Sequence, residues 1–142
     1  MILLDELTTG SWVSYYEGMK PIYEKVVNLT MQGAGVGLPI KYESDNILYQ
    51  RIVPFVSLYP IPMDYYLSLH KCLLKKKEDD SRLLWTLDYQ GEVVFGVEKK
   101  ENTFTLIKMG EPLGEPFYAV HEFQRMCFTH LQLDFPIELY NE

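Results

Sequence analysis

The sequence predicts an α+β fold: N-terminal antiparallel strands forming a small half-barrel, a short helix, a three-stranded meander and a C-terminal helix packed on the sheet. Segments rich in β-branched and aromatic residues, separated by turn residues, fill the first half of the chain. Two later segments place apolar residues at helical spacing. Between them, strand-like segments are joined by short connections, which favours antiparallel pairing.

The whole chain is expected to fold as one domain over residues 1–142. This length is typical of a single domain with one hydrophobic core. The sequence shows no repeat and no linker rich in Gly, Ser or Pro that would divide it. Hydrophobic residues make up 47% and charged residues 23% of the chain, which is not the composition of a disordered protein.

The first half of the chain predicts four strands, at residues 11–16, 21–29, 36–42 and 47–56. Tight turns are expected at Glu17-Gly18 and at Ser44-Asp45-Asn46. After Pro62, apolar residues recur at helical spacing behind Asp64, which predicts a helix of about ten residues. Lysines 71 and 75–77 are expected at or just beyond the end of this helix, where positive charge is favourable.

A meander is predicted next, at residues 83–89, 92–98 and 103–109, with Gln90-Gly91 as its first turn. Pro112 and Pro116 are expected to end the β-structure and to lead into a helix over residues 118–131. The predicted inward stripe of this helix comprises Val120, Phe123, Cys127 and Leu131. Its other side is expected to carry His121, Glu122, Gln124 and Arg125.

The charge balance argues against nucleic acid as a partner. Twenty acidic and thirteen basic residues give a net charge of −7, the wrong sign for a protein that neutralises phosphates. The basic run at residues 75–77 is followed at once by acidic residues 78–80, so the two cancel. We interpret this segment as a solvated connection, with a docking patch as the alternative.

A cytoplasmic protein without membrane contact, metal or cofactor is expected. The longest apolar stretch, residues 52–63, contains three prolines and is too short for a membrane helix. The first six residues lack the basic region of a secretion signal. Cys72 and Cys127 lie far apart without metal-ligand spacing, which favours two reduced, buried thiols.

Three short segments carry a family resemblance. Residues 7–13 read Leu-Thr-Thr-Gly-Ser-Trp-Val, residues 60–64 read Pro-Ile-Pro-Met-Asp, and residues 120–124 read Val-His-Glu-Phe-Gln. In order and spacing they resemble an uncharacterised family of small bacterial proteins common in mobile elements and prophages. Ser11, Met63-Asp64 and Glu122 depart from that family's usual residues. The resemblance implies a bacterial mobile-element context and no known chemistry.

The glycine-rich segment at residues 33–37 is the first candidate site. A nucleotide-binding loop would stand between a strand and a helix, but Leu38-Pro39-Ile40 begins no helix. A turn or β-bulge with unusual φ angles is therefore expected. The sequence also lacks the nucleophile motif Gly-x-Ser-x-Gly.

His121 is the second candidate. It shares a predicted helical face with Arg125, and Glu122 is adjacent. One hypothesis is therefore that His121 and Glu122 form a general acid–base pair. The alternative is a polar anchor at the sheet edge. A catalytic site would also need a pocket and a group from another element, and the sequence displays neither.

Tyrosine is the third candidate feature, since eleven Tyr, seven Phe and two Trp occur in 142 residues. Tyrosine is enriched in recognition surfaces because it joins a large apolar ring to a hydrogen-bonding tip. Eight tyrosines lie in the first half, among them Tyr42 and Tyr49. The residues expected to contribute to a binding face are Tyr15, Tyr16, Tyr59, Tyr65, Tyr66, His121 and Arg125.

The first functional hypothesis is a non-enzymatic protein-binding or accessory module, with a protein partner or a second copy of the chain. The second is a small enzyme with an acid–base site around His121. The third is an acidic decoy that occupies a nucleic-acid-binding protein.

Overall fold

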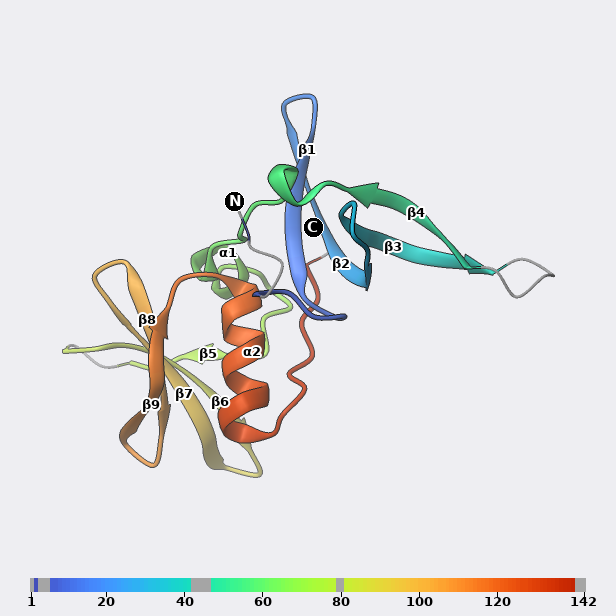
Figure 1. The fold of residues 1–142 in the computed structure, drawn as a ribbon. Coiled ribbons are helices and arrows are strands. Elements are labelled where there is room, and N and C mark those ends of the chain that lie inside the picture. Colours follow the sequence, from blue (N-terminus) through green and yellow to red (C-terminus); the bar gives the residue numbers. More distant parts are fainter. Residues whose placement is uncertain (1, 3–5, 42–46, 79–80, 140–142) are drawn as a thin grey trace. The chain divides into compact units, whose positions relative to one another are not determined.

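The computed structural model describes residue 2 and residues 6–41, 47–78 and 81–139, which form an α+β fold (Figure 1). The chain divides into two compact units. The first unit comprises Met1–Ile61 together with Leu139–Glu142, and the second comprises Pro62–Glu138. The single domain expected over residues 1–142 stays a prediction, because two compact units can unfold either together or separately.

The first unit contains an antiparallel sheet whose strands pair in chain order. The sequence predicts all of them, with ends that differ by only a few residues. They are β1 (Trp12–Glu17), β2 (Lys20–Leu29), β3 (Ala34–Lys41) and β4 (Ile47–Val53).

The long strand β2 explains why this sheet curls. Its first part pairs with β1 and its last part, from Val26, pairs with β3, with a shift of register between Val26 and Asn28. A bulge bends its strand and increases the local twist. The curl also brings β4 near β1, since the Arg51 guanidinium lies 2.6 Å from the Glu17 carboxylate. The predicted half-barrel is confirmed (Figure 1).

Glycines 33 and 37 act as the sequence predicts, at a turn and a bulge. Gly37 has a φ of +91°, within a shift of register between β3 and β4. At Gly33, an added Cβ would lie 2.2 Å from the backbone oxygen of Val53, so only glycine allows this approach. The first expected turn is present at Gly18, whose φ is +63°. The second, at Ser44-Asp45-Asn46, lies outside the described residues.

The core of the first unit lies inside the curled sheet. It gathers side chains from all four strands, from the residues before β1 and from the segment after the short 3-10 helix η2 (Phe55–Ser57). Each fully buried aliphatic side chain stabilises the fold by about 1.5–3 kcal/mol. The buried members are Ile2, Leu7, Val13, Tyr15, Val26, Ala34, Val36, Val53 and Leu58.

The second unit contains a five-stranded antiparallel sheet, again in chain order. The predicted meander forms its centre, as β6 (Leu83–Tyr89), β7 (Glu92–Lys100) and β8 (Thr103–Lys108). Two further strands extend it, β5 (Lys75–Lys76) and β9 (Glu111–Phe117).

Strand β9 corrects the expectation that Pro112 and Pro116 end the β-structure. Both prolines lie inside this strand, and Pro112 is paired with Ile107 of β8. A proline is tolerated there because β9 is an edge strand. The side of β9 that faces away from β8 pairs with no further strand, so a missing N–H group on that side costs no sheet hydrogen bond. Likewise, Lys75 and Lys76 pair with Thr86 and Trp85 instead of following a helix.

Helix α1 (Met63–Leu67) is shorter than predicted. The Ser68 hydroxyl donates to the backbone oxygen of Tyr65 at 2.7 Å, a local bond that competes with helix propagation. Beyond the helix, the Leu73 N–H donates to the Tyr66 hydroxyl at 3.3 Å. Both bonds join α1 to the segment between α1 and β5.

Helix α2 (Val120–Leu131) begins two residues later than predicted. Its start is capped by Glu122, whose carboxylate accepts the backbone N–H groups of Tyr118 and Ala119 at 3.1 and 3.0 Å. Val120 belongs to the buried stripe, as predicted. His121 is also buried, which corrects the expectation that it lies on the outward side.

An aromatic cluster joins α2 to the sheet. The Phe123 ring lies 6.3 Å from that of Phe95 on β7 and 5.7 Å from that of Phe117 on β9. Phe135, beyond the helix, lies 5.2 Å from Phe123. The C-terminal helix therefore packs on the sheet, as predicted (Figure 1). None of the helices in the described residues has the length and apolar character needed to cross a bilayer.

Candidate functional site

Tyr16 and Tyr59 form an exposed aromatic pair in the first unit. Their ring centroids lie 5.5 Å apart at an interplanar angle of 81°, and the residues are 55% and 45% exposed. Two backbone hydrogen bonds hold Tyr59 beside β1: the Ser14 N–H donates to Tyr59 O at 3.0 Å, and the Tyr59 N–H donates to Ser14 O at 2.8 Å. We call Tyr16 and Tyr59 the tyrosine pair.

Tyr15 lies on the opposite face of β1, because successive side chains of a strand alternate. It is buried, and its hydroxyl donates to the Glu24 carboxylate at 2.5 Å. Burial, followed by this hydrogen bond, raises the pKa of Tyr15. The Arg51 guanidinium lies over the ring, 5.4 Å from its centroid. Tyr15 thus belongs to the core of the half-barrel and not to the exposed pair.

The other predicted binding residues lie in the second unit. Tyr66 is buried, which raises the pKa of its hydroxyl, whereas Tyr65 is half-buried. His121 is buried and Arg125 is exposed, so the pair does not present one common surface. The side chains of Tyr42 and Tyr49 are not among those described.

The contacts of Glu122 bear on the acid–base hypothesis. Its carboxylate accepts two backbone N–H groups at the start of α2, so it caps the helix. His121, one residue earlier, does not line the hollow found in the second unit. The described residues also contain no group of three His, Cys, Asp or Glu side chains placed to hold a metal ion.

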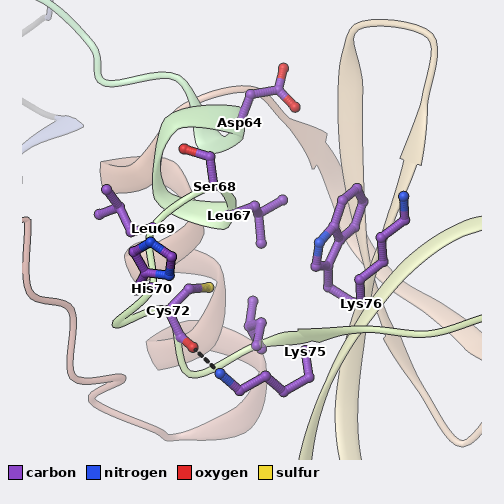
Figure 2. A pocket seen from close by; sticks show the side chains of 10 residues that line it. Asp64, Leu67, Ser68, Leu69, His70, Cys72, Lys75 and Lys76 are labelled. Carbon is purple, nitrogen blue, oxygen red and sulfur yellow. Dashed lines mark hydrogen bonds between the residues drawn. The ribbon is translucent and has the colours of Figure 1, made fainter.

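That hollow has a volume of about 460 Å³ and opens between α1 and the first strands of the second sheet. Figure 2 shows Leu67 of α1 on one side of it and Lys76 of β5 on the other. Its size is within the range of small-ligand sites. The lining residues are Asp64, Leu67, Ser68, Leu69, His70, Cys72, Leu74, Lys75, Lys76 and Trp85.

Two lysines of β5 give the hollow its charge. The Lys75 ammonium donates to the backbone oxygen of Cys72 at 3.1 Å, and the Lys76 ammonium lies 6.0 Å from the Trp85 ring centroid (Figure 2). In the described part of the chain, neither ammonium is ion-paired with a carboxylate. By contrast, Asp64 accepts two bonds from Lys99, at 3.0 and 3.1 Å.

The thiol that lines the hollow is unsuited to covalent chemistry. Cys72 is buried, and burial raises the pKa of its thiol, so little of the reactive thiolate is present. The second thiol, Cys127, is also buried, and burial raises its pKa to about 12. Both cysteines are free, as the sequence predicts.

The sequence interpretation missed this hollow. Its available signal was the basic run at residues 75–77, which we interpret from sequence as a solvated connection. In the structure, Lys77 is paired with Asp88 at 2.6 Å, whereas Lys75 and Lys76 line the hollow. Trp85 joins them through strand pairing, which the sequence of this run alone does not specify.

No protein-family model, curated protein or solved structure matches the chain. The resemblance to a mobile-element family stays a prediction. Its three segments have clear places in the structure: residues 7–13 lead into β1, residues 60–64 lead into α1, and residues 120–124 form the first turns of α2.

Proposed function

We propose that the chain is a non-enzymatic protein-binding module that contacts its partner through the tyrosine pair. The observation that supports this is the edge-to-face arrangement of two large, exposed rings, which the Ser14–Tyr59 backbone bonds hold in place. Exposed tyrosines held in one position lose little entropy when a partner binds. Tyrosine is also among the residues that dominate binding energy in protein interfaces.

The proposed partner is a protein with a basic contact surface. The net charge of −7 repels a second copy of the chain and attracts a basic one. Tyrosine rings also attract Lys and Arg side chains through cation–π contacts. A nucleic-acid-binding protein is one such partner, so the acidic-decoy hypothesis is a special case of this proposal.

The proposed setting is the cytoplasm of a bacterium, as an accessory protein of a mobile element without direct contact to nucleic acid. Its support is the resemblance carried by residues 7–13, 60–64 and 120–124, together with the acidic charge. The enzyme alternative around His121 gains no support from the contacts described, since Glu122 is used as a helix cap.

Site-specific photo-crosslinking tests the proposal. A benzoylphenylalanine placed at position 16 in the full chain is expected to crosslink a partner in cells, whereas one at position 89 is not. Tyr89 is a matched control because it is exposed and lies in the second unit. The crosslinked protein is then purified, and its affinity for the chain is measured.

Tyr16→Ala and Tyr59→Ala are each expected to weaken that affinity about tenfold, the effect of a moderate hot spot. Tyr89→Ala should leave it within about twofold of the unmodified chain. Equal losses at all three positions, or a crosslink only to a second copy of the chain, would contradict the proposal.

A further inference from the structure

The hollow of the second unit combines a cationic edge with an apolar wall. Leu74 is buried, and Leu67 and Leu69 are half-buried, so the wall presents hydrocarbon to the space. Lys75 and Lys76 supply two ammonium groups at its edge. Polar and apolar surface contribute about equally to the lining. In small-molecule sites a few charged groups orient the ligand and apolar side chains contact its body.

Both ammonium groups are positioned by contacts within the second unit. Lys75 is held by the carbonyl oxygen of Cys72, and Lys76 lies over the indole ring of Trp85. Neither contact neutralises the positive charge. Because these contacts already restrict the lysine side chains, the binding of an anion to one of them costs less side-chain rotamer entropy.

The acidic residue of the lining does not cancel this charge. The Asp64 carboxylate is bonded by Lys99, which lies outside the lining. The lining therefore contains two lysines and one carboxylate that already has a cation. His70, which is exposed at the same hollow, can donate a further hydrogen bond from a ring N–H.

We propose that this hollow binds a small organic anion. Its carboxylate or phosphate group contacts one of the two ammonium groups, that of Lys75 or that of Lys76, because consecutive side chains of β5 leave the strand on opposite faces. Its apolar body lies against Leu67 and Leu74. A peptide is a poorer occupant, since β5 is an edge strand and lysines on an edge strand discourage the addition of another strand. The proposal is independent of the tyrosine pair.

Titrations followed by NMR of the ¹⁵N-labelled full chain test this site. The probes are phenyl phosphate, benzoate and the neutral analogue benzamide. The chain has two tryptophans, and only Trp85 lines the hollow, so the Trp12 indole signal is an internal reference. We expect phenyl phosphate and benzoate to shift the Trp85 indole signal and the Lys75 and Lys76 amides to saturation.

Benzamide is expected to bind about tenfold more weakly, because it lacks the charge. Of Lys75→Gln and Lys76→Gln, the one that removes the contacting ammonium group should weaken benzoate binding about fivefold. Lys108→Gln, an exposed lysine on β8, is the matched control and should change nothing. The dispersion of the amide signals shows that each variant remains folded.

Two outcomes would overturn the proposal: benzamide binding as tightly as benzoate, or unchanged benzoate binding in both Lys75→Gln and Lys76→Gln. Tighter binding of phenyl phosphate identifies a phosphate ligand, and tighter binding of benzoate identifies a carboxylate ligand. Either result supports the proposed class of small organic anions.

Discussion

Glu98 is a buried residue on β7, and its carboxylate pairs with two cations, Arg82 and Lys100. It accepts a hydrogen bond from the Arg82 guanidinium, and the Lys100 ammonium lies 3.5 Å from it. The bond from Arg82 is the main cause that lowers the pKa of Glu98, and it outweighs the opposing effect of burial. At neutral pH, this side chain is charged and paired.

The lowered pKa predicts a pH-dependent contribution to stability. The pairing is fully present above the ordinary Glu pKa of 4.5 and is lost as the pH falls through the lower folded-state value. Since Arg82 is partly exposed, Glu98→Gln should lower the free energy of unfolding by only about 1 kcal/mol at pH 7. Urea unfolding at pH 7 and below pH 4 measures the difference.

The expected result is a difference between the two proteins that shrinks at the lower pH. Glu92→Gln serves as the control, because Glu92 is exposed on the same strand and no ion pair is found for it in the described residues. A loss at Glu98 that stays constant across the pH range would show that the carboxylate charge is not responsible.

At the scale of elements, Gly114 lets α2 pack closely on β9. It has a φ of +77°, and an added Cβ would lie 2.2 Å from the Met126 Cε and 2.6 Å from the His130 Nε2. Gly110 has a similar φ of +80° but nothing within 4 Å of an added Cβ. Alanine at either position would therefore require an unfavourable backbone conformation. Only at position 114 would the added Cβ also collide with side chains of α2.

We predict that Gly110→Ala lowers the free energy of unfolding by about 1–2 kcal/mol, the cost of a left-handed backbone for alanine. Gly114→Ala should cost about 1 kcal/mol more, because Met126 and His130 must move. Urea unfolding of both variants measures this. Equal losses would show that the helix side chains adjust freely and that the close approach is not needed.

At the scale of the whole molecule, each unit has a core of its own. The aliphatic core of the first unit and the aromatic cluster around Phe123 in the second draw on separate residues. Separate cores allow separate opening reactions. A substitution that damages one core is therefore expected to leave the other protected.

Gly33→Ala tests this, since its Cβ would meet the Val53 backbone oxygen and force β3 and β4 apart. Hydrogen exchange followed by mass spectrometry should become faster in β1–β4 and stay unchanged in β6–β8. Gly114→Ala should give the reciprocal result. If either substitution speeds exchange equally in both units, the chain opens as the single domain predicted from its sequence.

The elements that the sequence predicts well depend on local interactions. The turn at Gln90-Gly91 is an example, since both residues adopt positive φ and β6 and β7 pair on either side of it. The positions of β1–β4 follow likewise from strand-forming residues and turns, and the burial of Val120, Phe123 and Cys127 follows from helical spacing. Tyr15 and Tyr16 are neighbours on a strand, so their opposite faces are also a local property.

Distant contacts decided the rest. Strand β5 forms because Lys75 and Lys76 pair with Thr86 and Trp85 of β6, about ten residues later in the sequence. The same pairing places Lys75, Lys76 and Trp85 in the lining of the hollow.

By itself, the sequence of this protein determined its α+β class, most of its strands and its two helices, because turn preference and hydrophobic periodicity act over a few residues. Only the tertiary structure decided that Tyr59 lies against Tyr16, that His121 is buried and that two lysines face a hollow. Those features join residues far apart in the chain, and local preferences carry no information about such pairings.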